Sequence, residues 1–437
     1  MLRNRRAWVG LGVVAIVLVL VGSFLALHRA RQPAGIEQQA REFVTLGLTY
    51  GHANDDVLDG YFGPPELEPP ADEPAPEPAV LRANLAKLKA DIESGPPSDR
   101  ADRLSARIDS LIALIDANSL NERMSFDEEA QRIYGLTIPE PDQAAMRQAR
   151  EELASLLPGP EPLYERVAKF ETAFVVPFGQ RRAVFMRALE ECKARTASHW
   201  PLPANDELDV QWTDGVDAAW HRYEGDSRST LQINPQAIAF IGSALDVACH
   251  EAYPGHHAQF LAMSERSGAA RLPVEETLVF VQSPGQLLRE GAAEYGVQLA
   301  FPPSERAAFL RDTLFPLAGF NPGSAEKYVQ VHWLVAQLAA ASTPIIRDYR
   351  DGRKTFYDTS HALEDEALIA SPRALLNFVD QNRAYVLGYS VARDLVRRCV
   401  EARAGPADGE AASRWSALRA IVAATDVSAL QGEQCAA

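Results

Sequence analysis

The sequence predicts a mainly α protein with a small β-sheet, and three observations support this fold class. Apolar residues recur at helical spacing, for example at Leu81, Leu85, Leu88 and Ile92. Short segments rich in β-formers gather in one region, residues 207–234. Hydrophobic residues make up 47% of the 437 residues and aromatic residues 8%, which is typical of a globular protein. We therefore expect a large helical core with one minor sheet.

The charge of the chain is strongly acidic. The formal net charge is −16 at pH 7. Residues 1–32 hold five arginines and no acid, which leaves 38 basic against 59 acidic residues in the remainder. A body this acidic repels phosphate backbones, so we expect no nucleic-acid partner.

The first element is an apolar segment near the N-terminus. Residues 8–27, WVGLGVVAIVLVLVGSFLAL, carry no charge and are about long enough to cross a bilayer. The segment is longer than the apolar part of a signal peptide, and no A-x-A cleavage site follows it. We expect residues 1–35 to form an uncleaved single-pass anchor in the inner (cytoplasmic) membrane, with the body in the periplasm or extracellular space. A long signal peptide and a buried core helix are the alternatives.

Residues 36–206 are expected to form an N-terminal helical part. Its first helix is predicted over residues 36–60. Residues 64–78 contain seven prolines and five acids, which predicts a solvated loop because neither helix nor sheet tolerates so much proline. Further helices are expected over residues 81–92, 104–115 and 160–200.

Residues 207–437 are expected to hold the functional site and to form one cooperative domain with the first part. Three short segments open this part, ELDVQW, AWHRYEG and STLQIN, and turn residues separate them, as expected for strands. Asn234 and Pro235 form an N-cap and first-turn pair, which predicts that the next helix begins there. The STLQIN strand could offer an edge to which an extended peptide adds.

A histidine-rich stretch, CHEAYPGHHAQFL over residues 249–261, nearly reproduces the zinc-peptidase pattern H-E-x-x-H. In that pattern residues i and i+4 share one helix face, so both imidazoles reach one zinc ion. Here His256 and His257 follow His250 at +6 and +7. On a straight helix His256 would face away from His250, and His257 would lie two turns distant.

A Pro-Gly pair removes this obstacle. Pro254 interrupts the helix, and Gly255 can adopt the backbone angles that follow. If the pair loops out, His256 takes the place of the second histidine. We therefore predict that His250 and His256 bind a metal and that His257 does not. The alternative is that the pair simply ends one helix and the histidines are surface or core residues.

A second stretch, QLLREGAAEYGVQLAF, predicts a helix that carries Glu290 and Glu294. Zinc peptidases often complete a two-histidine site with a carboxylate and leave the fourth position to water. Small residues after Glu290 would let this helix approach another closely, which makes Glu290 the predicted third ligand. Glu294, one turn later, could support a ligand through a hydrogen bond. The alternative is that both acids face solvent.

These motifs carry a family resemblance. HEAYPGHHAQ and REGAAEYG together resemble the bacterial family catalogued as domain of unknown function 885, whose members pair H-E-x-x-P-G-H-H with E-G-W-A-x-Y. REFVTLGLTYGHANDDVLDGYFGP resembles the family's opening helix and AYVLGYSVARDL its final helix, so the resemblance spans roughly residues 38–400. Ala292 stands where the family usually has tryptophan. The resemblance implies a mostly helical, zincin-like fold related to gluzincin peptidases. It also implies metal ligands at His250, His256 and Glu290 and a catalytic carboxylate at Glu251.

The predicted function is a zinc metallopeptidase. Zinc held by two imidazoles and a carboxylate lowers the pKa of its water to about 7 and polarises a carbonyl. Glu251, next to His250, would accept the proton of the water and deliver it to the leaving amine. Tyr385 is the candidate donor to the oxyanion, with His332 and Tyr389 behind it.

Two other classes of protein fit the same residues. One is a non-catalytic protein that binds peptides or cell-wall fragments, and the other is a metal-dependent hydrolase of esters or non-peptide amides. The expected cofactor is one zinc ion per chain, or another divalent metal. The expected partners are a peptide or small amide substrate and, through residues 8–27, the membrane.

The four cysteines show no C-x-x-C spacing, so they indicate neither a zinc knuckle nor a redox pair. An extracytoplasmic location would permit disulfides, and a bond between Cys399 and Cys435 could tie down the C-terminal tail. Cys249 would point about 100° away from His250 on a helix, which predicts a role in core packing.

Overall fold

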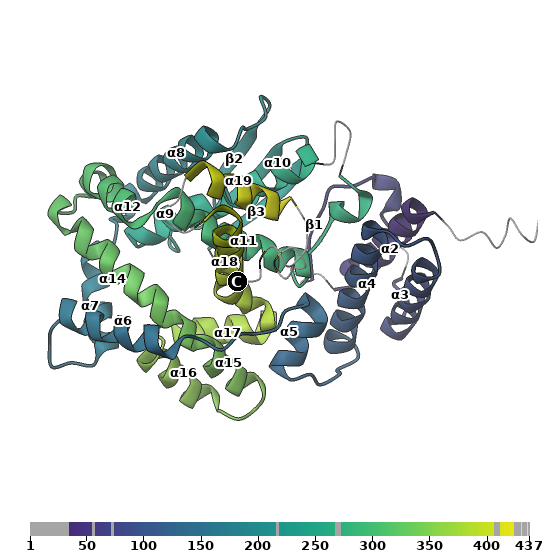
Figure 1. Ribbon diagram of the computed structural model, residues 1–437, viewed down its shortest axis with the longest axis horizontal. Helices are drawn as coiled ribbons and strands as arrows, with labels where there is room; N and C mark the ends of the chain where they lie inside the picture. The colour runs from purple at the N-terminus through teal and green to yellow at the C-terminus, as the bar shows by residue number, and fades with distance from the viewer. Residues whose placement is uncertain are drawn as a thin grey trace, which may run out of the picture.

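The structure is a computed structural model, and 69% of its residues are helical. Figure 1 shows how the helices are arranged. Two small sheets complete the secondary structure of the described part. The prediction of a mainly helical chain is therefore confirmed. The predicted anchor, residues 8–27, lies outside the described residues. The structure describes residues 35–437 except 55–56, 71–73, 216–217, 267–271, 406–410, 424–429, 431–434 and 436–437.

The N-terminal helices pack into a hairpin with one further helix beside it. α3 (Pro78–Glu93) and α4 (Asp99–Asn118), which correspond to two of the predicted helices, form a hairpin, and α2 (Ile36–His52) packs on both. The side chain of Ser98 caps α4 by accepting a hydrogen bond from the backbone of Ala101. The four apolar residues of the α3 stripe are at most 3% exposed, which explains why the hairpin forms.

The prediction that the first helix extends to residue 60 was wrong. α2 ends at His52, and Leu58–Tyr61 form strand β1. β1 pairs antiparallel with β5 (Leu278–Phe280), with a bulge between Leu58 and Gly60. This partner lies more than 200 residues later, so the local pattern gives no sign of it.

Four helices follow in the first part of the chain. α5 begins with a capping box, in which Ser125 and Glu128 satisfy each other's backbone N–H groups. The predicted helical region 160–200 is confirmed, although 3-10 turns divide it. The helices are α5 (Phe126–Tyr134), α6 (Gln143–Leu156), α7 (Leu163–Glu171) and α8 (Arg181–His199), and the 3-10 turns are η1 (Pro65–Leu67), η2 (Thr172–Phe174) and η3 (Phe178–Gln180).

The three predicted strands form one sheet. Their order is β2-β4-β3, with β4 parallel to β2 and antiparallel to β3. β4 is therefore the central strand, and both of its edges are already paired. The expectation that the STLQIN strand offers a free edge to a peptide was wrong. The strands are β2 (Glu207–Trp212), β3 (Ala219–Gly225) and β4 (Arg228–Ile233).

The remaining helices surround α11, most of whose residues are buried. α11 contacts α9, α18 and η8, and Figure 1 shows α11 and α18 near the middle of the molecule. α9 begins at Ile241 and not at the predicted Asn234, whose side chain instead accepts a hydrogen bond from the backbone of Gln236 in a turn. The principal helices are α9 (Ile241–Glu251), α10 (His256–Arg266), α11 (Pro284–Ala300), α12 (Pro303–Phe309), α13 (Phe315–Ala318), α14 (Ala325–Leu338), α15 (Ser342–Arg350), α16 (Phe356–Asp365), α17 (Pro372–Asn382), α18 (Val391–Ala404) and α19 (Ala411–Val422). The shorter turns are η4 (Val274–Thr277), η5 (Leu310–Leu314), η6 (Pro322–Ser324), η7 (Ala339–Ala341) and η8 (Arg383–Tyr389).

One helical stretch of the described part, Pro322–Arg350, is long and apolar enough to cross a membrane by length and composition alone. It contains α14 and α15, and α14 packs against α6 and α12. These contacts make α14 part of the helical body.

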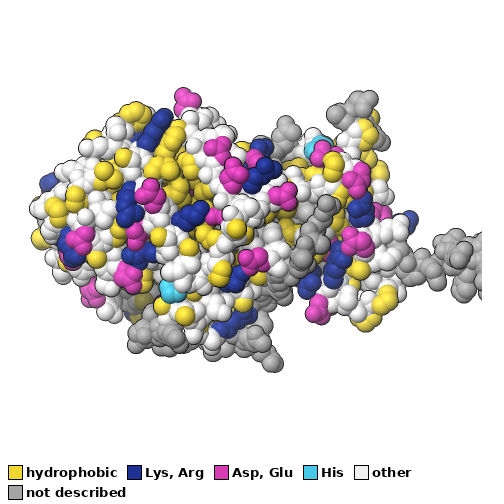
Figure 2. All heavy atoms as spheres, turned by 90° about the horizontal axis from the view of Figure 1, so that it is seen from above, with side chains coloured by type: hydrophobic (Ala, Val, Ile, Leu, Met, Phe, Trp, Pro, Cys, Tyr) yellow, Lys and Arg dark blue, Asp and Glu magenta, His cyan; other side chains and the backbone are white. Residues whose placement is uncertain are grey.

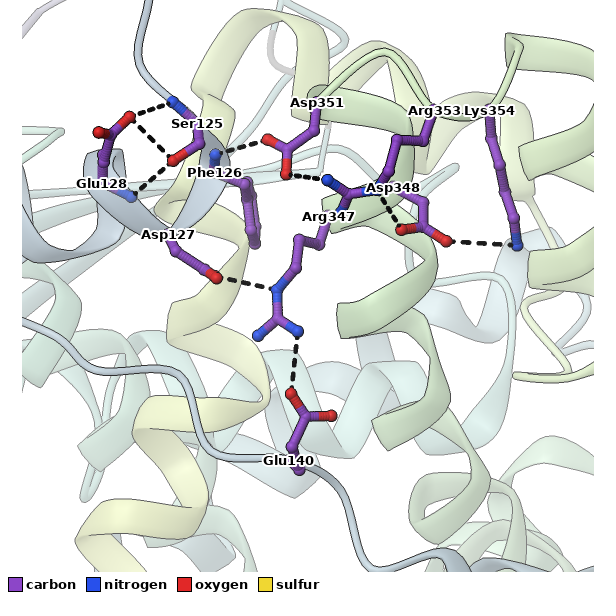
Figure 3. A network of polar contacts seen from close by, with 10 residues as sticks. All are labelled: Ser125, Phe126, Asp127, Glu128, Glu140, Arg347, Asp348, Asp351, Arg353 and Lys354. Carbon is purple, nitrogen blue, oxygen red and sulfur yellow. Dashed lines mark hydrogen bonds and ion pairs between the residues drawn. The ribbon is translucent and has the colours of Figure 1, made fainter.

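A polar network ties the start of α5 to the end of α15 (Figure 3). The guanidinium of Arg347 donates to Asp127 at 2.9 Å and to Glu140 at 3.0 Å. The carboxylate of Asp351 accepts the backbone N–H of Phe126 at 2.8 Å. The network therefore connects residues of the first part to residues more than 200 positions later. Elsewhere on the surface, Figure 2 shows acidic and basic side chains interspersed over the face viewed from above.

Two disulfides join segments that lie far apart in the sequence. Cys399 bonds to Cys435, as expected for a tie to the C-terminal tail. Cys192 of α8 bonds to Cys249 of α9. The prediction that Cys249 packs in the core is confirmed, because its side chain is fully buried, and the disulfide adds a crosslink to the helix that carries His250.

Candidate metal centre

The helix is interrupted between α9 and α10 at the predicted Pro-Gly pair. The backbone N–H of Gly255 donates to the carbonyl of Cys249 at 3.0 Å. A Cβ at this position would lie 1.6 Å from the carbonyl oxygen of His250, so only glycine fits. The break lets His256, the first residue of α10, return toward His250 at the end of α9.

The structure brings the three predicted ligands together. One ligand atom from each of His250, His256 and Glu290 lies within 4.8 Å of the others. Nε2 of His250 lies 3.2 Å from Oε2 of Glu290, and Nε2 of His256 lies 3.3 Å from Oε1. All three residues are at least 91% buried. A break in one helix and a carboxylate from another therefore converge on a single point.

These residues fit a zinc ion. Two imidazole nitrogens and one carboxylate are the protein ligands of many catalytic zinc sites. Oε2 of Glu290 is buried, and within the described part of the chain it accepts no hydrogen bond. Burial acts to raise the pKa of Glu290, but His256 and His250 outweigh it and hold that pKa well below its usual range. An ionised carboxylate whose two oxygens each lie next to one imidazole nitrogen matches the ligand set of a cation site.

A second carboxylate supports the cluster. Oε1 of Glu294 lies 3.1 Å from Nδ1 of His250, on the opposite side of the ring from Glu290. A carboxylate in this position fixes the ring orientation and the tautomer of a metal-binding histidine. Burial acts to lower the pKa of His250, but the charges of Glu290 and Glu294 outweigh it and raise that pKa well above its usual range.

Close backbone packing places Glu290 in the centre. A Cβ at Gly388 of η8 would lie 2.7 Å from Cβ of Glu290. A Cβ at Gly291 would lie 2.5 Å from the backbone of Ala392 in α18. The predicted close approach at the small residues after Glu290 is thus confirmed, and α18 with η8 is the neighbour that makes it.

Glu251 ends α9 directly beside the cluster. It is less buried than the three candidate ligands, and no described residue donates a hydrogen bond to its carboxylate. Burial raises the pKa of its carboxyl group, while His250 and His256 act to lower it. The side chain is therefore placed to take up and release a proton near the predicted metal position.

The three residues considered for the oxyanion donor, Tyr385, Tyr389 and His332, do not lie together. The hydroxyl of Tyr385 donates to Oε1 of Glu290 at 2.7 Å, so its proton is engaged by a candidate ligand. Tyr389 is only partly buried, and its ring lies over that of His250 at a centroid distance of 6.2 Å. His332 does not lie behind Tyr385 but pairs with Glu171 at 2.9 Å.

His257 is held away from the cluster by a buried hydrogen-bonded chain. Its Nε2 lies 2.6 Å from Oδ1 of Asp206, and its Nδ1 lies 2.7 Å from Oγ of Ser229. Ser229 lies 2.9 Å from Nε2 of His221, whose ring is 6.0 Å from that of His256. Both ring nitrogens of His257 are therefore engaged by residues outside the cluster.

The sequence analysis did not predict this series of buried hydrogen bonds. Asp206 precedes β2 and has no motif around it, although it also accepts hydrogen bonds from Lys193 and Tyr253. Burial acts to raise the pKa of Asp206, but its hydrogen bonds to His257, Lys193 and Tyr253 lower it to about 2. Ser229 and the next two residues of β4 are all buried, so no alternation of exposed and buried residues along the strand marked Ser229.

Two further charged residues near the centre were not assigned a role from the sequence. Asp59 occupies the bulge of β1, a feature that often re-aims a side chain toward a functional site. Burial raises its pKa to about 6, although Arg289 and His256 act to lower it. Arg289 is 5% exposed, and its Nε donates to Gln286 at 2.8 Å.

A cleft adjoins the cluster between α11 and α14. Its lining includes Glu294 from the centre, Arg306 from α12, Trp333 from α14 and Arg393 from α18. Trp333 is 46% exposed, which is unusual for so large an apolar side chain.

Comparisons with known proteins find only weak similarity. No protein-family model and no curated protein matches the chain. A solved structure described as a "putative lipoprotein" from Colwellia psychrerythraea aligns with 78% of this chain at 14% identity and a TM-score of 0.46. The chain covers 66% of that protein, just under two thirds. A "putative lipoprotein of unknown function" from Shewanella oneidensis aligns with 78% of this chain at 13% identity, with 72% of its own length covered and a TM-score of 0.42.

Proposed function

We propose that the protein is a zinc-dependent hydrolase that cleaves amide bonds in peptides. The observation that carries this proposal is the convergence of His250, His256 and Glu290, whose ligand atoms lie within 4.8 Å of one another. A zinc ion held by these three residues would keep one position for water, as in catalytic zinc sites. The resemblance to domain of unknown function 885 supports a zincin-like fold of the gluzincin type.

The chemistry follows from the residues around the centre. A bound zinc ion would polarise the substrate carbonyl and lower the pKa of water. Glu251 takes the proton from the attacking water and delivers it to the leaving amine. Glu294 holds the ring of His250, and Tyr385 holds Glu290, so the ligand set is pre-oriented. We assign the oxyanion donor to Tyr389, whose ring lies over that of His250.

We further propose that the body lies outside the cytoplasmic membrane, anchored through residues 8–27. The support is the uncharged length of that segment and the presence of two disulfides. Disulfides persist in oxidising compartments such as the periplasm and are rare in the cytosol.

The test is metal analysis combined with a substrate panel. The purified full chain should hold one zinc ion, and it should cleave peptides faster than esters or acyl amino acids. Preferred cleavage of esters would favour the hydrolase of non-peptide substrates. A chain that holds zinc but cleaves nothing across a broad peptide library would be a binding protein.

A further inference from the structure

A small cavity between α4 and the first turns of α11 is lined by two arginines. Arg107 comes from α4 and Arg289 from α11, and Gln282 and Ser283 at the start of α11 also line it. Its one acid, Glu276, forms an ion pair with Arg107. The lining thus holds two guanidinium groups but one carboxylate, and most of its remaining residues are apolar.

Arg289 is a buried cation without an ion-pair partner among the described residues. It is 5% exposed, and its guanidinium lies 5.4 Å over the ring of Phe260. Only its Nε donates a hydrogen bond in the described structure, to Gln286 at 2.8 Å. Arginine stays protonated in proteins, so a buried guanidinium with free terminal donors is built to receive an anion. Its planar fork matches a carboxylate.

Gln286 connects this arginine to the metal centre. Its Oε1 accepts from Nε of Arg289, and its Nε2 donates to Oε1 of Glu290 at 3.3 Å. One side-chain amide and two hydrogen bonds thus separate the guanidinium from a candidate ligand. An extended residue spans about 3.3–3.6 Å. A peptide end held by Arg289 therefore places an amide bond within one or two residues of the centre.

A buried side-chain amide also lines the same cavity. Gln282 is 6% exposed, and in the described part its Oε1 has no hydrogen-bond donor. The two ends of a side-chain amide have the same shape, so this group can present its N–H donors to an anion in the cavity. The cavity thus combines two cations with a free amide group.

We propose that Arg289, with Arg107 beside it, binds the terminal carboxylate of a peptide substrate. The protein then removes residues from the carboxyl end of peptides. This inference rests on the proposed hydrolase function and adds the direction of attack.

The experiment compares two N-acetylated tripeptides that differ only at the carboxyl end, acetyl-Ala-Ala-Leu and its C-terminal amide. Binding is measured by calorimetry on the full chain carrying Glu251→Gln, so that neither peptide is cleaved. The free acid should bind at least tenfold more tightly than the amide. In the wild type the same preference should appear in kcat/KM, mainly through KM.

Variants assign the preference to its residues. Arg289→Gln should bring the ratio of acid to amide affinity close to one, and Arg107→Gln should reduce it less. Arg181→Gln is the matched control, because Arg181 is 9% exposed and donates to the backbone carbonyls of Val176 and Pro235 on α8's side of the fold. It should keep the full preference. If Arg289→Gln does not fold, the two peptides on the parent chain and on Arg107→Gln still test the site.

Three results would overturn the assignment. The first is equal binding and cleavage of acid and amide, and the second is an unchanged preference in Arg289→Gln. The third is seen when acetate is added to the wild type. If acetate stimulates the cleavage of both peptides equally, a free anion and not a peptide end fills the site. Selective binding of the acid by a chain that cleaves nothing would leave the subsite standing and reject the hydrolase. Cleavage of both peptides alike would do the reverse.

Discussion

The hydroxyl of Tyr385 lies 2.7 Å from Oε1 of Glu290, although 95 residues separate the two. Close packing of η8 on α11 makes this contact, because Gly388 leaves no side chain between them. A hydrogen bond to a carboxylate ligand fixes its rotamer and tunes its basicity. Tyr385 thus holds the carboxylate of the candidate ligand Glu290, and we take the neighbouring Tyr389 as the candidate oxyanion donor.

We predict different effects for the two tyrosines. Tyr385→Phe removes a hydrogen bond from a ligand, so zinc affinity should fall roughly 10-fold or more. Tyr389→Phe should leave zinc affinity unchanged but lower kcat by about 10²–10³, as expected when an oxyanion donor is removed. Chelator competition measures the first effect and steady-state kinetics the second. An opposite pattern would restore Tyr385 as the oxyanion donor.

The spacing of residues within two short motifs was sufficient to predict which residues form the centre of the site. The Pro-Gly pair predicted the break that brings His256 toward His250, and the next helix supplied Glu290. His250 and His256 belong to one short motif and Glu290 to a second, and each motif could be recognised from its own local sequence. Helical and strand periodicity also placed the α3–α4 hairpin and the three strands β2, β3 and β4.

What the sequence did not predict depends on contacts between distant segments. Asp59 comes close to the centre because β1 pairs with β5 across a bulge, and no local pattern encodes that partner. β4 became central because β2 adds beside it in parallel. Asp206 and Ser229 meet His257 only after the sheet has folded against α10. Each of these is a tertiary relationship between elements whose local propensities are ordinary.

The two adjacent histidines should respond differently to substitution. His256→Ala removes a candidate ligand and should abolish stoichiometric zinc binding. His257→Ala should weaken zinc binding much less, but it leaves Asp206 buried with fewer partners. We expect it to lower the free energy of unfolding by about 3 kcal/mol. Metal content and chemical denaturation of both variants check this, and the reverse ranking for zinc would show that the wrong histidine was assigned.

Asp206 predicts a specific acid sensitivity. Its pKa in the folded chain is about 2, against an ordinary value of 3.8, because its hydrogen bonds outweigh burial. A depressed folded pKa contributes stability above the unfolded value, and this stability is lost as pH falls through the folded value. The wild type should therefore lose about 2 kcal/mol relative to Asp206→Asn between roughly pH 4 and pH 2. Urea unfolding at several pH values measures the difference, and parallel curves would contradict the assignment.

The proposed topology gives a direct prediction in cells. Residues 8–27 should anchor the chain and residues 36–437 should face the periplasm or exterior. Protease added to intact spheroplasts should then digest the body, while a cytoplasmic marker protein survives. A body that stays protected until the membrane is lysed would reject this topology.

Glu251→Gln separates a catalyst from a structural zinc site. Glutamine keeps the shape of glutamate, and Glu251 is not one of the three residues proposed to bind zinc, so the variant should retain one zinc ion per chain. It cannot accept a proton, so kcat should fall by about 10²–10⁴ with little change in KM. Glu305→Gln, on the exposed first turn of α12, is a control that should leave both quantities unchanged. Loss of zinc from Glu251→Gln would make Glu251 a ligand, and an unchanged rate would place the proton transfer on another residue.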